Sequence, residues 1–166
     1  MRYLILSLSI LIFAASCTKS SSPSSSAEAI LTKSRWKVTG GNVVAQVPYS
    51  SPRRDTTWKI PAGLVNNSCK SQMIFTFNDN YTGTLDGSSS ACNEGKQPFT
   101  WYLLNDNTLG IINANNFFDS STAIGTMSNI STTQFNYGYT VVLKLPNPSG
   151  LAYYDTFRYN MIFTSN

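Results

Sequence analysis

The side chains best suited to chemistry in this 166-residue chain are its cysteines, because the sequence contains no histidine. Without histidine, neither a Ser-His-Asp triad nor a histidine-ligated zinc site can be built. A bond between Cys69 and Cys92 would close a ring of about 24 residues and stabilise the domain by about 3 kcal/mol in the chain-entropy model. A reactive thiol pair is the alternative, although these two cysteines lack the Cys-x-x-Cys spacing of redox pairs. The choice depends on the compartment, which the N-terminus indicates.

Charged side chains are too few and too scattered to predict a catalytic site. The glutamates are Glu28 and Glu94, and aspartates stand in turn-forming runs such as 78–80, Asn-Asp-Asn. Such runs resemble fragments of calcium loops but lack the 12-residue spacing of an EF-hand. The net charge of +4 is spread along the chain, with Arg53-Arg54 as its one adjacent basic pair. We expect no enzyme, no metal site, no cofactor and no nucleic-acid partner.

The N-terminal residues predict a secreted protein with a lipid anchor. Arg2 is followed by an apolar run over residues 4–15, which is too short to span a bilayer and fits a signal peptide. Small residues at 14–16 precede Cys17, which resembles the lipobox of bacterial lipoproteins. The resemblance implies cleavage before Cys17 and acyl chains such as palmitate on that residue, which together make a stable anchor. An ordinary secretory signal is the alternative.

The chain divides into three segments on this reading. Residues 1–16 are the removed signal peptide, residues 17–26 are the lipidated cysteine with a Ser-rich tether, and residues 27–166 are one domain. Thr18 stands where lipoproteins retained in the inner membrane carry Asp, so the resemblance implies the outer membrane, in either leaflet. In that oxidising compartment, we expect the two remaining cysteines to form a structural disulfide.

Alternation of apolar and polar residues predicts an all-β domain after a short helix over 27–33. Strands are expected over 35–39, 43–47, 57–61, 73–77, 81–85, 99–103, 109–112, 135–145 and 151–163, with a break or bulge at 40–41 and loops over 62–70 and 113–121. Eight to ten antiparallel strands joined by short turns should curl into an up-and-down barrel, because closure removes exposed edges. A β-sandwich is the alternative.

Three runs in this pattern resemble a known family. They are LTKSRWKVTG at 31–40, FTFNDNYTGTLDG at 75–87 and FTWYLLNDNTLGI at 99–111. Together with the two closing strands they are similar to the lipocalin-like lipoproteins of Bacteroidota-type bacteria, over most of 30–163. The resemblance implies a lipocalin-like barrel and an address in the cell envelope.

Tyrosines on the apolar face of the two closing strands predict a ligand site. Tyr137, Tyr139, Tyr153 and Tyr159 each offer apolar area and one hydroxyl, which suits an amphipathic cavity. Asp155 has the same parity, so it either orients a polar group of the ligand or is solvated near the end of its strand. We expect a monomer that binds a small apolar or amphipathic molecule in a cavity of the barrel, without catalysis.

Docking is the alternative function. Four residues on the predicted solvent-facing side of their strands would form an apolar patch that docks an envelope protein or a polysaccharide: Val142, Ile74, Tyr102 and Tyr154.

Some single residues carry further expectations. The tryptophans Trp36, Trp58 and Trp101 are expected in the core. The lipocalin resemblance would place Arg158 over Trp36, and an exposed arginine is the alternative. Asp55-Thr56-Thr57 resembles a bacterial O-glycosylation acceptor.

Overall fold

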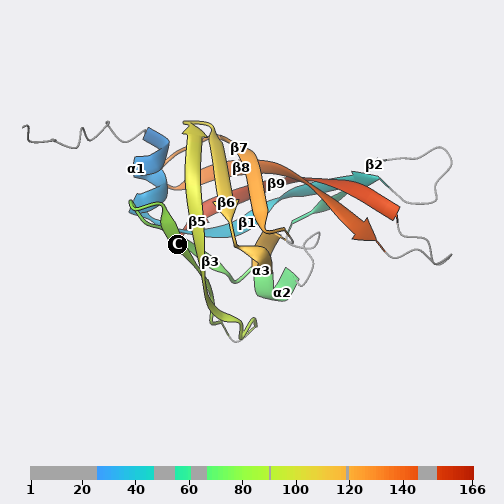
Figure 1. The fold of residues 1–166 in the computed structure, drawn as a ribbon, viewed down its shortest axis with the longest axis horizontal. Helices are drawn as coiled ribbons and strands as arrows, with labels where there is room; N and C mark the ends of the chain where they lie inside the picture. The colour runs from blue at the N-terminus through green and yellow to red at the C-terminus, as the bar shows by residue number, and fades with distance from the viewer. Residues whose placement is uncertain (1–25, 47–54, 61–66, 90, 119, 146–152) are drawn as a thin grey trace, which may run out of the picture.

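Nine antiparallel strands form one sheet in the described part of the chain (Figure 1). The computed structural model describes residues 26–46, 55–60, 67–89, 91–118, 120–145 and 153–166. The strands are β1 (Arg35–Gln46), β2 (Asp55–Lys59), β3 (Ile74–Phe77), β4 (Thr82–Gly87), β5 (Gly95–Asn105), β6 (Thr108–Ile112), β7 (Thr122–Ser128), β8 (Gln134–Leu145) and β9 (Tyr153–Ser165). The helices are α1 (Ser26–Lys33), α2 (Asn67–Lys70) and α3 (Asn115–Phe118).

The sheet closes on itself. Its strand order is β2-β1-β3-β4-β5-β6-β7-β8-β9, and β1 also pairs with β9. Eight strands therefore make a closed antiparallel barrel, and β2 is an extra strand that pairs with β1. The predicted up-and-down barrel is confirmed, and the alternative of a β-sandwich is wrong.

Strand β1 has two neighbours along one of its edges, and a bulge interrupts its pairing along the other. The β1–β9 register shifts between Val38 and Gly40, and Gly41 has a φ of 120°. Residues with a Cβ rarely adopt that conformation, so the second glycine is required at this point. Before the bulge β1 pairs with β3, and after it β1 pairs with β2, while β9 follows the opposite edge. The predicted break or bulge at 40–41 is confirmed.

Helix α1 covers one end of the barrel, away from β2 and the β8–β9 ends (Figure 1). It buries Ala27 and Leu31, and the carbonyl of Leu31 accepts a hydrogen bond from Nε1 of Trp36 at 2.9 Å. Phe135 packs edge-on against the Trp36 ring, with the ring centroids 4.9 Å apart. These contacts confirm Trp36 as a core residue, and they fix the helix on the first strand.

Aromatic rings fill the barrel between α1 and α3. Phe75 lies among them, with ring centroids of Phe117 at 4.9 Å, Phe163 at 5.4 Å and Phe118 at 5.8 Å. Phe117 and Phe118 belong to α3, which lies inside the stretch predicted as irregular. That prediction is wrong, because a four-residue helix is too short to show a periodic pattern, although it buries both phenylalanines.

Other elements also differ from the prediction. Helix α2 occupies part of the predicted loop over 62–70. Strand β7 has no counterpart among the predicted strands, because two of its inward residues are Ala123 and Gly125, which give a weak alternation. Tyr81, the first residue of the strand predicted over 81–85, lies before β4, is 47% exposed and has a φ of 62°.

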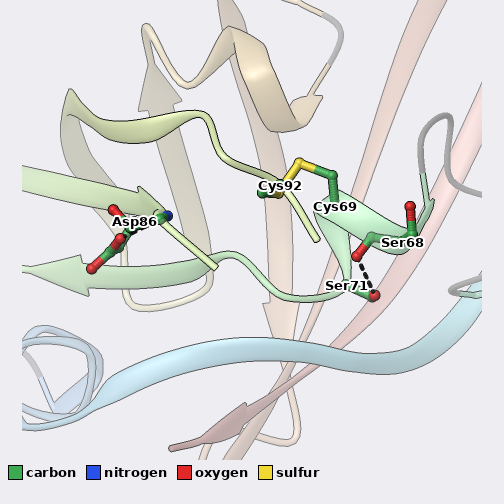
Figure 2. The surroundings of a disulfide bond; sticks show 6 residues. Ser68, Cys69, Ser71, Asp86 and Cys92 are labelled. Carbon is green, nitrogen blue, oxygen red and sulfur yellow. Dashed lines mark hydrogen bonds between the residues drawn. A yellow bond between two sulfur atoms is a disulfide. The ribbon is translucent and has the colours of Figure 1, made fainter. Parts of the chain in front are cut away.

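The disulfide between Cys69 and Cys92 is confirmed. Figure 2 shows that it joins α2 to the loop that follows β4, beside the hydrogen bond from Ser71 to the carbonyl of Ser68. Both cysteines pack against the core cluster. The bond therefore ties the segment before β3 to the loop between β4 and β5.

The closing hairpin has the predicted parity. Strands β8 and β9 continue beyond the barrel, together with the second half of β1 and with β2 (Figure 1). Their inward residues include Phe135, Tyr137, Tyr139, Tyr159, Met161 and Phe163, all of which are buried. The four strands form an extension of the sheet whose inner face continues the inner face of the barrel.

Candidate functional site

A row of paired residues crosses the extension from β2 to β8. Trp58 pairs with Val43, Val43 pairs with Tyr159, and Tyr159 pairs with Tyr139. Residues directly opposite each other in antiparallel strands point to the same face of the sheet. The row therefore places a tryptophan and two of the predicted ligand-binding tyrosines on one surface, drawn from strands far apart in the sequence.

The rings of this surface stack along the β8–β9 hairpin. The ring centroids of Tyr139 and Tyr159 are 4.8 Å apart with an interplanar angle of 8°, and those of Phe157 and Tyr159 are 6.4 Å apart. We call Trp58, Tyr139, Phe157 and Tyr159 the aromatic shelf. The two tyrosines are buried, Phe157 is half-buried and Trp58 is 42% exposed. The shelf thus has a buried floor, formed by the two tyrosines, and an accessible side, formed by Phe157 and Trp58.

Asp155 lies at the end of the shelf. It is two residues from Phe157 on the same face of β9, it pairs with Leu143, and it is only 7% exposed. Its Oδ1 accepts a hydrogen bond from the backbone N–H of Thr156 at 2.7 Å. The described residues provide no other partner for this carboxylate, and they contain no cluster of three or more potential metal ligands. The side chain is thus largely buried, while Oδ2 is not among the fully buried unpaired atoms, and both predicted roles of Asp155, ligand orientation and solvation near the strand end, stay predictions.

Tyr137 is deeper in the barrel and contributes to its packing. It is fully buried, and its hydroxyl donates to the carbonyl oxygens of Leu109 at 3.2 Å and Ala123 at 2.9 Å. Burial raises the pKa of this hydroxyl above its usual range. Tyr137 therefore packs beneath the shelf. Its hydroxyl is not available to a ligand, because two main-chain carbonyls already accept its hydrogen bonds.

Phe118 marks the boundary between the filled interior and the shelf. Its ring packs edge-on against Tyr139, with centroids 5.2 Å apart, and against Tyr137 at 6.0 Å. On the α1 side of Phe118, aromatic rings occupy the barrel. The structure therefore places Tyr139, Tyr159 and Asp155 on one face of the β8–β9 hairpin, while the side chain of Tyr153 lies outside the described residues.

Trp58 is a member of the shelf that the sequence analysis assigned to the core. That assignment is wrong for Trp58, and it is confirmed for Trp101, which is 2% exposed. The sequence of β2 already indicated that Trp58 is not a core residue, because Trp58 is the only apolar residue in the run Asp-Thr-Thr-Trp-Lys. A strand with a single apolar side chain has too little apolar surface to be a barrel strand buried on one face.

The outer face of the extension carries an ion pair. Nη2 of Arg158 lies 2.6 Å from Oδ2 of Asp55, and both side chains are about half exposed. The expectation that Arg158 covers Trp36 is wrong, because Arg158 pairs with Val44 on β1, well away from Trp36 along that strand. Thr57 is exposed beside this ion pair. Glycosylation of the Asp55-Thr56-Thr57 run stays a prediction.

The predicted apolar patch does not form as one surface. Val142 and Tyr154 are 58% and 67% exposed on the outer face of β8 and β9. Ile74 and Tyr102 are half-buried on β3 and β5, which are separated from that pair by other strands. An alanine Cβ at Gly110 would overlap the ring of Tyr102, so this ring lies against the sheet. The docking hypothesis therefore loses the surface on which it was based.

Comparisons with known proteins were made for the whole chain. No family model matches it, and no curated protein matches it. None of the described helices is long and apolar enough to cross a bilayer. The chain is thus a closed antiparallel β-barrel extended by one strand, with a shelf of aromatic rings on the same face as a largely buried carboxylate.

Proposed function

We propose that this protein is a lipid-anchored lipoprotein of the bacterial cell envelope, and that it binds a small apolar or amphipathic molecule on the aromatic shelf. In this proposal the acylated Cys17 holds the mature chain on the outer membrane, and residues 18–25 connect the anchor to α1. The barrel acts as a rigid support for the shelf. No catalytic step is part of the proposed function.

One observation carries the ligand-binding half of the proposal. The shelf combines a buried floor, formed by Tyr139 and Tyr159, with a half-buried Phe157 and a partly exposed Trp58. Stacked rings with an accessible side offer a large apolar area at little entropic cost, and tryptophan and tyrosine are typical anchors of binding sites. Val141 and Leu143 lie on the same face along β8 and are also half-buried, so apolar area continues toward Asp155.

A neutral fluorescent probe tests this half. We expect the chain from Thr18 onward, which contains the whole described barrel, to bind N-phenyl-1-naphthylamine saturably with increased probe fluorescence. Trp58→Ala should weaken binding at least about fivefold, which corresponds to about 1 kcal/mol, because it removes an exposed ring from the shelf. Fluorescence titration gives both dissociation constants.

Tyr154→Ala is the matched control. Tyr154 is also a large exposed aromatic residue of the extension, but it lies on the opposite face of the sheet from Asp155. Its removal should leave the dissociation constant unchanged. The proposal is contradicted if the folded protein shows no saturable binding, or if Tyr154→Ala weakens binding as much as Trp58→Ala.

The lipid anchor has a separate test. We expect the mature chain, purified from a bacterial envelope, to begin at Cys17 and to carry thioether-linked diacylglycerol and an amide-linked acyl chain. Mass spectrometry of the N-terminal peptide measures both. A chain with the same sequence from Thr18 but an ordinary secretory signal should move from the detergent phase to the aqueous phase in Triton X-114 partition. An unmodified Cys17 in the mature protein would overturn the anchor.

A further inference from the structure

Asp155 is the feature of the shelf that an apolar ligand does not explain. A carboxylate that leaves water without a partner is costly, so buried carboxylates are normally paired. We propose that the shelf selects amphiphiles whose polar end is an ammonium group, with Asp155 as the counter-ion. This inference rests on the proposed function, since it names the chemical class of the ligand that the shelf would hold.

The environment of Asp155 supports a cationic partner. The side chain is 7% exposed, and one of its oxygens accepts the backbone N–H of Thr156. In the described part of the chain, Oδ2 has no hydrogen-bond or ion-pair partner. A group that donates a charge-assisted hydrogen bond to Oδ2 would therefore pair the carboxylate, and an ammonium group is such a donor.

The neighbouring rings favour the same ligand class. Phe157 and Tyr159 follow Asp155 at two-residue steps on one face of β9, which places successive side chains about 7 Å apart. Cations are attracted to the faces of aromatic rings, and more strongly where water is excluded. An alkylammonium head at Asp155 would thus have its alkyl chain along Phe157 and the tyrosines.

No cation of the same two strands competes for this position. Lys144 and Arg158 have the opposite parity on β8 and β9, so they point to the outer face. There Arg158 is paired with Asp55. The inner face of the extension therefore presents a carboxylate among apolar side chains, whereas the outer face presents the basic residues.

Three probes with the same ten-carbon chain test the inference: decylammonium, decan-1-ol and decanoate. Isothermal titration calorimetry at pH 7, on the chain from Thr18 onward, should give the tightest binding for decylammonium and the weakest for decanoate. Asp155→Asn should weaken decylammonium binding about tenfold while leaving the affinity for decan-1-ol unchanged. The ligand-free variant should unfold at about the same temperature, because the side-chain oxygen of asparagine can still accept the backbone N–H of Thr156.

Asp55→Asn is the control, since it removes a carboxylate from the outer face of the same extension. It should leave the preference among the three probes unchanged. Equal affinity for decylammonium and decan-1-ol, or a loss of thermal stability in Asp155→Asn, would overturn the ammonium inference while leaving the proposed ligand site intact. Binding of N-phenyl-1-naphthylamine but of none of the three probes would overturn the ammonium inference alone, and binding of none of the four molecules would overturn both proposals.

Discussion

Replacing Gly41 with alanine is expected to destabilise the protein by about 4 kcal/mol, since it combines backbone strain with a steric clash. Gly41 has a φ of 120°, which residues with a Cβ rarely adopt. A Cβ added there would overlap the carbonyl oxygen of Asn160 and lie 2.9 Å from Cα of Met161. Both atoms belong to the backbone of β9, which cannot move away without opening the β1–β9 pairing that closes the barrel.

Gly40→Ala is the matched control for this prediction. The nearest atom to a Cβ at Gly40 is Cδ1 of Ile162 at 3.6 Å, which is an ordinary van der Waals contact. Urea unfolding, followed by the fluorescence of the buried Trp36 and Trp101, should show a large fall in the midpoint for Gly41→Ala and little change for Gly40→Ala. Similar midpoints for the two variants would contradict the described closure of the barrel.

Replacing Phe75 with alanine should also cost about 4 kcal/mol of unfolding free energy, as is typical for a phenylalanine removed from a packed core. Phe75 is fully buried, and its ring lies within 6 Å of the ring centroids of Phe99, Phe117, Phe118 and Phe163. These rings come from three elements other than β3, namely β5, α3 and β9, so a cavity at Phe75 removes contacts that hold α3 against the barrel strands.

Ile74→Ala serves as the comparison, because Ile74 is the neighbouring residue on the other face of β3 and is half-buried. Its loss should cost about 1 kcal/mol, in proportion to the smaller apolar area that it buries. Thermal or urea unfolding of the two variants measures the difference. If Phe75→Ala costs no more than Ile74→Ala, the aromatic filling between α1 and α3 is not the main core of this domain.

Local alternation in the sequence was sufficient for the long strands. It predicts the inward parity of β8 and β9, and the observed burial of Phe135, Tyr159 and Met161 follows that parity. The turn predicted for the Asn-Asp-Asn run at 78–80 forms, and the same three residues recur in a turn at 105–107. In the second run, the side chain of Asn105 accepts the backbone N–H of Asn107, which is the local bond that makes such residues favour turns.

Short elements were the main source of error in the predicted fold. Helix α3 is a four-residue element that carries two buried phenylalanines, and β7 alternates through Ala123 and Gly125. A pattern needs several repeats, and inward residues of clear apolar character, before it can be detected. Helix α3 is too short for repeats, and β7 lacks inward residues of clear apolar character, so packing against the rest of the barrel determines these elements.

The candidate site likewise has features that the sequence determines and features that only the tertiary structure decides. Its sequence determines that Tyr139, Asp155 and Tyr159 share one face, because residues of equal parity on a strand point to the same side. Only the tertiary structure decides that Asp155 is buried, that Trp58 joins the tyrosines from an extra strand, and that α3 fills the barrel below them. These features depend on which strands pair and where the barrel closes, and such long-range register is not encoded in the local alternation of any one strand.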